Sequence, residues 1–166
     1  MTQFTIRPAT VEDCPGIARV QVDSYCSAYQ GFFPQTYLDL FTYEGQASDW
    51  VQWMNDHPED ILLVAESGAG QVTGYVLARA HPEIYPGYDS EIIAIHMLPP
   101  LKGQGIGRAL MRRVVEALLA RGCQSTMLWT LQGNPIREWY ERLGGELIGE
   151  KRDWWDDWEM VEVAYG

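Results

Sequence analysis

A glycine-rich loop, Lys102-Gly103-Gln104-Gly105-Ile106-Gly107, is the feature that most constrains how this chain can fold. An apolar run at 92–98 and two prolines come before it. A helical pattern comes after it, because apolar residues recur on one face at Ile106, Leu110, Val114, Ala117 and Leu118. The sequence therefore predicts a strand, a proline break, the glycine loop and a helix, in that order.

This loop has the composition of a diphosphate-binding site. Its three alternating glycines allow the backbone to approach a ligand closely and to direct N–H groups outward. The helix that follows adds unpaired N–H groups and the positive end of its dipole, which together suit a phosphate. Lys102 and Arg108 flank the loop with positive charge.

Two common phosphate-binding motifs do not fit the loop. A dinucleotide fingerprint and a P-loop both require glycine at the position that Arg108 occupies when counted from Gly103. The loop instead resembles the Arg/Gln-x-x-Gly-x-Gly/Ala loop of the GNAT superfamily of acetyl-CoA-dependent N-acyltransferases, with Lys102 in place of the usual Arg or Gln.

The resemblance covers essentially the whole chain. Residues 134–145 are similar to the family's second signature, an Asn before a helix that carries Tyr and ends in Leu-Gly. Residues 28–34 resemble the turn between helices where GNAT members bind the acceptor, and residues 4–10 resemble the opening strand. The match is specific for the acetyl-CoA half and general for the acceptor half.

The resemblance implies acetyl-CoA as co-substrate and assigns residues to it. The loop from Lys102 to Arg108 would hold the diphosphate. Ile95, His96 and Met97 would contact the pantetheine through their main chain, with Met97 a candidate oxyanion donor. The side chains of Ile95 and Met97 can fill the core at the same time. Asn134 would hydrogen-bond the pantetheine arm, or would cap the helix that starts near Pro135.

Two residues are candidates for proton transfer. Tyr140 matches the tyrosine of the second signature, and a phenol, with a reference pKa near ~10, carries a proton at neutral pH that it can give to the departing thiolate. The alternative is a core aromatic residue. Glu91, at the head of the strand before the loop, is the candidate base for the amine, or else an exposed charge. Glu83 or a water chain is the rival base.

The acceptor side is less well defined by the sequence. Tyr25 and Tyr29, with Glu83 and Ser24, are expected to line the acceptor site. Three tryptophans and three aspartates between 153 and 158 can box a cation, form a homodimer contact or cover the core as a lid.

The strand and helix patterns predict an α/β fold with a mixed sheet. In agreement with this, the resemblance implies a single GNAT-like domain over 1–166, with a mixed, mostly antiparallel central sheet and helices on both faces. Strands are expected at 4–7, 61–65, 72–80, 90–97, 126–131, 146–148 and 158–165. Helices are expected from Thr10 to Tyr29, at 35–40 and 48–55, after the loop, and at 135–143. Residues 81–87 are expected to form a loop.

Charge and composition limit the partners. The net charge of −11 disfavours nucleic acid and anionic membrane, and it favours a cationic acceptor. No signal peptide or membrane-spanning run is visible, so a cytoplasmic protein is expected. The three cysteines are read as reduced thiols, and neither they nor the three histidines have ligand spacing, so no metal site is expected.

Three functions fit these observations. The first is N-acetyl transfer to a primary amine of a small, polyamine-like or peptide acceptor by direct attack. The second is a non-catalytic acetyl-CoA sensor. The third is a structural or partner-binding domain, which the intact glycine loop disfavours. Tyr140 and Glu91 together favour the enzyme over the sensor.

Overall fold

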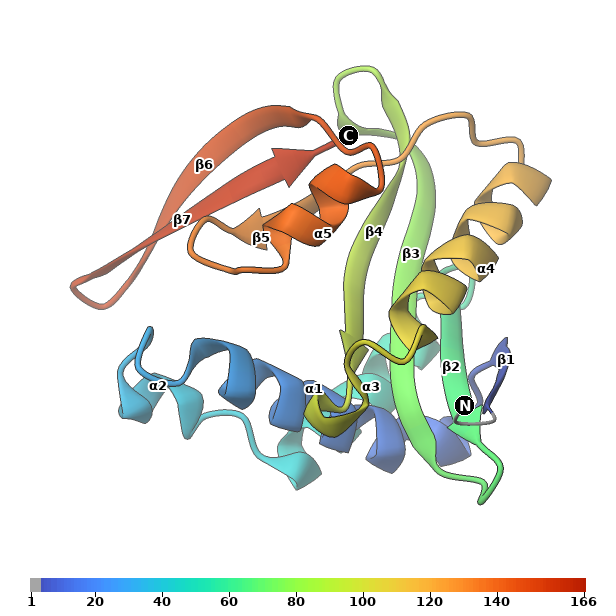
Figure 1. The fold of residues 1–166 in the computed structure, drawn as a ribbon, viewed down its shortest axis with the longest axis horizontal. Coiled ribbons are helices and arrows are strands. Elements are labelled where there is room, and N and C mark those ends of the chain that lie inside the picture. Colours follow the sequence, from blue (N-terminus) through green and yellow to red (C-terminus); the bar gives the residue numbers. More distant parts are fainter. Residues whose placement is uncertain (1–3) are drawn as a thin grey trace.

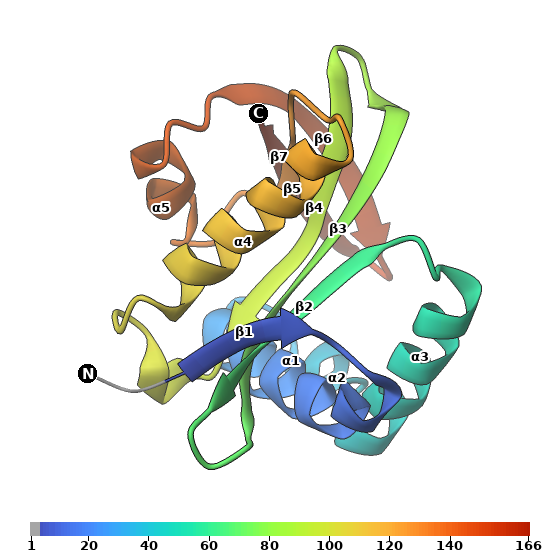
Figure 2. The ribbon, with the colours of Figure 1, turned by 90° about the vertical axis from the view of Figure 1, so that its right-hand side faces the viewer.

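The N-terminal half forms a four-stranded antiparallel sheet that is covered on both faces. The computed structural model describes residues 4–166, except for the side chains of residues 81–84 and 155. The sheet has the order β1-β2-β3-β4, with β1 at Phe4–Pro8, β2 at Ile61–Ser67, β3 at Val72–Tyr85 and β4 at Tyr88–Met97. Helices α1 (Cys14–Tyr29) and α3 (Tyr43–Asp56) lie on one face and α4 (Ile106–Ala120) lies on the other, as Figure 2 shows. A short helix, α2 (Gln35–Leu38), joins α1 to α3.

The C-terminal half forms a second, three-stranded sheet. Its order is β5-β7-β6, with β5 at Leu128–Leu131, β6 at Leu147–Trp155 and β7 at Trp158–Tyr165, and α5 (Arg137–Arg142) follows β5. The two sheets meet at a parallel bridge between Glu91 and Met127, where the Ile92 N–H donates to the Met127 carbonyl at 2.8 Å. Beyond the bridge, β5 and β4 diverge (Figure 1). The mixed α/β fold with helices on both faces is confirmed.

The hydrophobic face predicted for the helix after the glycine loop is correct. Ile106, Leu110, Val114 and Leu118 are buried, and Ala117 packs at the edge of the same core. This core continues across β2, β3 and β4 to Tyr140 of α5 and Tyr165 of the second sheet, so it joins α4 to both halves. A second core lies on the opposite face, between α1, α3 and the sheet. None of the described helices is long and apolar enough to cross a membrane.

Three predicted boundaries are wrong. Residues 81–87 are not a loop, because β3 continues to Tyr85 and pairs there with Tyr88. The Tyr85 hydroxyl donates to the Ile148 carbonyl at 2.9 Å, which holds this hairpin against the second sheet. The pairing is irregular between Ala80 and Tyr85, where a proline cannot donate a ladder bond.

The other two boundary errors lengthen an element. Helix α3 starts at Tyr43 and not at 48, because the Thr42 side chain caps it by accepting from the Gly45 N–H at 3.1 Å. Strand β6 continues to Trp155, since it pairs along its length with β7 around a two-residue turn at Asp156 and Asp157.

Candidate active site

The glycine loop has the conformation that a phosphate cradle requires. Gly103 and Gly105 have φ values of 80° and 88°, a region that favours glycine, and Gly105 is the N-cap of α4. A Cβ built at either glycine meets no atom within 4 Å, so both face open space. The side chains of Lys102 and Arg108 are exposed beside the loop. The loop therefore has room and positive charge for a diphosphate at the N-terminus of α4.

Position 107 requires glycine for a different reason, which is close packing. A Cβ there would collide with the end of the Met97 side chain and would lie 3.7 Å from the Trp139 ring. Gly107 thus lets α4 approach the end of β4 and the side of α5. Trp139 was not predicted to reach the loop, and only the packing of α5 brings it there.

The outer edge of β4 is free to bind a ligand next to the loop. Within the described residues, no strand pairs with this edge beyond the bridge at Glu91. The Leu98 N–H donates to the Thr73 carbonyl on β3, and main-chain groups alternate between the two sides of a strand. Ile95 and Met97 therefore direct their main-chain groups to the open edge.

His96 has the opposite orientation. Its main chain faces Tyr75 on β3, so the predicted main-chain contact of His96 with pantetheine is not supported by the geometry. Its imidazole Nδ1 lies 2.7 Å from the hydroxyl oxygen of Ser24, and its ring stacks on Tyr75. Burial, with a smaller effect of the Lys102 charge, lowers the pKa of His96 to about 4. A neutral, hydrogen-bonded imidazole in the site is a feature that the sequence reading missed.

Tyr140 lies on α5, buried at 8% exposure between Trp139 and Tyr165. None of the described residues hydrogen-bonds to its hydroxyl. Burial raises the pKa of Tyr140 above its usual value near 10, so the phenol keeps its proton at neutral pH. Tyr140 packs into the core with an unpaired hydroxyl, and its role as proton donor to the thiolate stays a prediction.

The side chain of Asn134 makes two hydrogen bonds. Its side-chain oxygen accepts from the Ile136 N–H at 3.1 Å, which is a capping contact before α5. Its side-chain nitrogen donates to the hydroxyl of Tyr29 at 2.7 Å. The predicted contact of Asn134 with the pantetheine arm stays a prediction.

Glu91 is half-buried where the two sheets separate. Its neighbours are charged: Lys151 on β6 and Arg79 on β3 lower its pKa, while Asp60 and Glu162 raise it. Burial is the largest effect and raises the pKa of Glu91 above its ordinary value of 4.5. A carboxyl group with a raised pKa is a better base near neutral pH.

Lys151 and Glu162 were not predicted as site residues. Their side chains form an ion pair of 3.0 Å across the β6–β7 hairpin, and Lys151 lies over the Trp129 ring at 4.4 Å. The sequence contained no usable signal for them, because β6 was expected to end at 148. The Arg79–Asp60 ion pair, at 2.7 Å, lies nearby on the α3 side.

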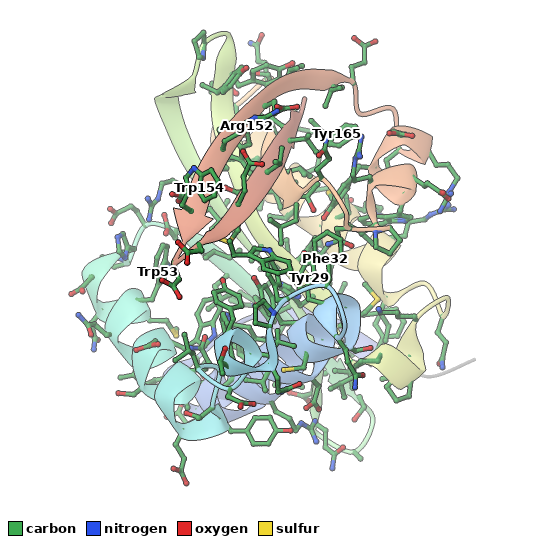
Figure 3. All side chains as sticks on the ribbon, turned by 90° about the vertical axis from the view of Figure 1, so that its left-hand side faces the viewer. Tyr29, Phe32, Trp53, Arg152, Trp154 and Tyr165 are labelled. Carbon is green, nitrogen blue, oxygen red and sulfur yellow. The ribbon has the colours of Figure 1, made fainter. Side chains whose placement is uncertain are left out.

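The expected acceptor-lining tyrosines lie together on α1. The rings of Tyr25 and Tyr29 are 4.5 Å apart, and burial raises the pKa of both phenols, that of Tyr29 to about 12. Figure 3 shows Tyr29 and Phe32 between α1 and the C-terminal sheet. The third predicted residue, Glu83, belongs to the part of β3 whose side chains lie outside the described residues.

The tryptophan patch lies at the tip of the β6–β7 hairpin. Trp154 is 62% exposed, so a lid over the core is the wrong interpretation for this residue. Trp158 is 42% exposed and contacts the Phe33 ring, with centroids 6.5 Å apart. The homodimer contact and the cation box stay predictions.

Comparison with known proteins decides the family. The profile of the acetyltransferase (GNAT) family matches residues 22–145. The chain belongs to the GNAT acetyltransferase family. It is 32% identical over 159 residues to YuaI, an uncharacterised N-acetyltransferase of Bacillus subtilis, and this match covers 96% of the chain and 87% of YuaI. The expectation of an acyltransferase is therefore confirmed.

Two solved GNAT structures show how far the fold extends. The PaiA N-acetyltransferase of Thermoplasma acidophilum, in complex with coenzyme A, has a TM-score of 0.69 and 15% identity, over 97% of this chain and 98% of that one. The yncA protein of Salmonella typhimurium, with its cofactor acetyl-CoA, has a TM-score of 0.69 and 18% identity, over 98% and 91% of the two chains. The GNAT fold thus accounts for nearly the whole of this protein.

Proposed function

We propose that this GNAT protein transfers the acetyl group of acetyl-CoA to a primary amine by direct attack. The observation that carries the proposal is the open edge of β4, which runs from the glycine loop at one end to Glu91 at the other. The loop fits the diphosphate, and the main chains of Ile95 and Met97 fit the pantetheine. Coenzyme A and acetyl-CoA in the two neighbouring structures support this choice of co-substrate.

The residues at the far end of the edge account for the chemistry. An alkylamine arrives mostly as an ammonium ion, because its pKa resembles that of Lys at about 10.4. Glu91 takes this proton, directly or through water, and the free amine nitrogen attacks the thioester carbonyl. The Met97 N–H, expected from the resemblance as the oxyanion donor, lies at the loop end of this edge, so we assign it to the pantetheine and not to the oxyanion. A C–N bond forms, the C–S bond breaks, and the nitrogen, cationic after the attack, loses a second proton. Tyr140 donates its proton to the departing thiolate and is reprotonated by this second proton, so the products are the amide and the free thiol of CoA.

The acceptor class follows from the charges around Glu91. Glu162 lies close enough to Glu91 to raise its pKa. The chain as a whole has a net charge of −11. Tyr25 and Tyr29 add aromatic walls. We assign a cationic amine, either a small polyamine-like molecule or a peptide amine, to this side of the site.

Two matched glycine variants test the co-substrate. Gly105 and Gly122 lie at opposite ends of α4, have φ values of 88° and 87°, and both face open space. Val at either position carries the same backbone strain, of about 1 to 2 kcal/mol. We expect calorimetric titration to show acetyl-CoA binding lost in Gly105→Val and kept in Gly122→Val. Equal affinity in both variants would exclude the loop as the diphosphate site.

An amine panel separates the enzyme from the sensor. Free-thiol release from acetyl-CoA is measured with polyamines, other small amines and peptide N-termini as acceptors. Turnover with any of them supports transfer. Binding of acetyl-CoA without turnover across the whole panel would favour the non-catalytic sensor.

A further inference from the structure

An apolar pocket lies beyond the point where β4 and β5 meet. Its volume is about 300 Å³, and it lies, partly open to solvent, between α4, the start of β5 and the end of α5. Ile92 and Met127, the neighbours of the bridge between the sheets, form one wall, and Tyr140 forms another. The pocket therefore adjoins both predicted landmarks of the thioester, the end of the open β4 edge and the phenol of α5.

The lining of this pocket suits a hydrocarbon chain. Met111 and Val115 of α4 face Leu128 and Leu143, so almost all of the surface is apolar. Met side chains adapt to chains of different length, because they are unbranched and flexible. The hydroxyl of Thr126 also lines the pocket and is buried without a hydrogen-bond partner. Buried hydroxyls usually have a hydrogen-bond partner, so this unpaired hydroxyl distinguishes the pocket from the fully packed core.

The direction of the cofactor leads into this pocket. A ligand that starts at the loop and follows the main-chain groups of Met97 and Ile95 moves toward Ile92. At Ile92 the edge closes, because its N–H is bonded to Met127. An acyl group at the end of the pantetheine that continues in the same direction reaches the pocket.

The two sides of β4 separate the acyl chain from the amine. Ile92 packs in the core on the α4 side, together with Val114 and Tyr140. Glu91 is adjacent in the strand and so faces the opposite side, where Arg79 and Asp60 are its neighbours. An amine approaching past Glu91 therefore attacks from the face opposite to the chain, and the two substrates do not compete for space.

We propose that this pocket binds the acyl chain of acyl-CoA donors longer than acetyl, with propionyl, butyryl and hexanoyl chains as its occupants. The inference rests on the proposed function, because it takes the orientation of the cofactor from it. The transfer chemistry is unchanged: the same C–N bond forms and the same C–S bond breaks.

Calorimetric titration of the full chain with CoA, acetyl-CoA, butyryl-CoA and hexanoyl-CoA tests the proposal without a known acceptor. Each methylene buried in an apolar pocket raises affinity by roughly fourfold. Butyryl has two methylenes more than acetyl, so we expect butyryl-CoA to bind about fifteenfold more tightly than acetyl-CoA. Equal or weaker binding of butyryl-CoA would overturn the proposal.

Two substitutions on α4 test whether the acyl chain binds in this pocket. Val115→Phe adds a ring inside the pocket, and Leu119→Phe adds the same ring one turn later, where the side chain is 59% exposed. The ratio of butyryl-CoA to acetyl-CoA affinity should fall to about one in Val115→Phe and stay near fifteenfold in Leu119→Phe. If Val115→Phe does not fold, Val115→Leu adds less volume and should lower the ratio partway. An equal ratio in the Val115 and Leu119 variants would place the chain elsewhere.

The failure of this inference is distinct from failure of the proposed function. If CoA and acetyl-CoA bind and only the longer chains do not, acetyl transfer stands and the acyl pocket is wrong. If CoA itself does not bind, both proposals fail.

Discussion

The side-chain amide of Asn134 donates a hydrogen bond to the hydroxyl of Tyr29, with 2.7 Å between nitrogen and oxygen. The amide is oriented by its other end, because its oxygen accepts from the Ile136 N–H. This bond connects the start of α5, on the cofactor side, to the end of α1, on the acceptor side. Tyr29 is 6% exposed, so the bond is shielded from water.

The first prediction concerns this bond. Tyr29→Phe leaves the part-buried amide nitrogen of Asn134 without its acceptor, so the free energy of unfolding should fall by about 1 to 2 kcal/mol. Tyr43→Phe is the matched control, because its hydroxyl bonds Asp23 at the surface, and it should change stability by less than about 0.5 kcal/mol. Urea denaturation measures both. Similar values for the two variants would show that the Asn134–Tyr29 bond is not stabilising.

The second prediction concerns Tyr140. Tyr140→Phe should lower kcat by roughly 100-fold, the scale of general acid catalysis, and leave acetyl-CoA affinity nearly unchanged. Tyr88→Phe removes a phenol at the start of β4, to which the proposed chemistry assigns no role, and serves as the control. Steady-state kinetics with an active amine, together with calorimetry, give both quantities. A Tyr140→Phe enzyme with parental kcat would assign the proton transfer to another group.

The third prediction concerns Glu91 as the base. Glu91→Gln keeps the shape and removes the proton acceptor, so turnover at pH 7 should fall and should recover partly at higher pH, where free amine is abundant. Acetyl-CoA binding should persist, because the loop lies at the other end of β4. A uniform loss of turnover at every pH would make Glu91 a positioning residue, and no loss would leave Glu83 or a water chain as the base.

A charge substitution near Glu91 provides an independent check. The base works deprotonated, so kcat/KM should fall as pH drops through the pKa of Glu91, which burial holds above 4.5. Among the neighbouring charges, Lys151 lowers this pKa the most. Lys151→Met should therefore raise the pKa of Glu91 and move the acid limb, the fall of kcat/KM at low pH, to higher pH. Arg152→Met, next to it in β6 and paired with Glu150 and Glu159, should not move the limb.

Local patterns predicted the cofactor half of the site. The conformations of Gly103 and Gly105 and the buried face of α4 depend on residues within one loop and one helix, where spacing alone carries the information. The candidate role of Tyr140 came from the resemblance of residues 134–145 to the second family signature, and it stays a prediction.

Long-range contacts account for what sequence reasoning missed. Asn134 and Tyr29 are 105 positions apart, and no periodic pattern relates them. Lys151 reaches Glu91 only because β6 continues past 148, and that extension depends on pairing with β7. Pairing partners are chosen by tertiary packing, which propensity does not describe.

The last prediction concerns His96 and the pH dependence of stability. The pKa of His96 is about 4 in the folded protein, because the ring is enclosed and close to Lys102, whereas an unfolded His has a pKa near 6.5. Between these pH values the unfolded chain binds a proton that the folded chain does not, so stability falls as pH drops through this window. The loss reaches up to about 3 kcal/mol.

His96→Gln isolates this contribution, since it removes the titrating ring and leaves a group that can hydrogen-bond Ser24. The carboxylates titrate alike in the parent and the variant, so the difference between their unfolding free energies reports His96 alone. Urea denaturation at pH 7 and at pH 4.5 should show that the parent loses more stability than His96→Gln. A difference that stays constant between the two pH values would mean that His96 has an ordinary pKa in the fold, and its neutral role beside Ser24 would then be wrong.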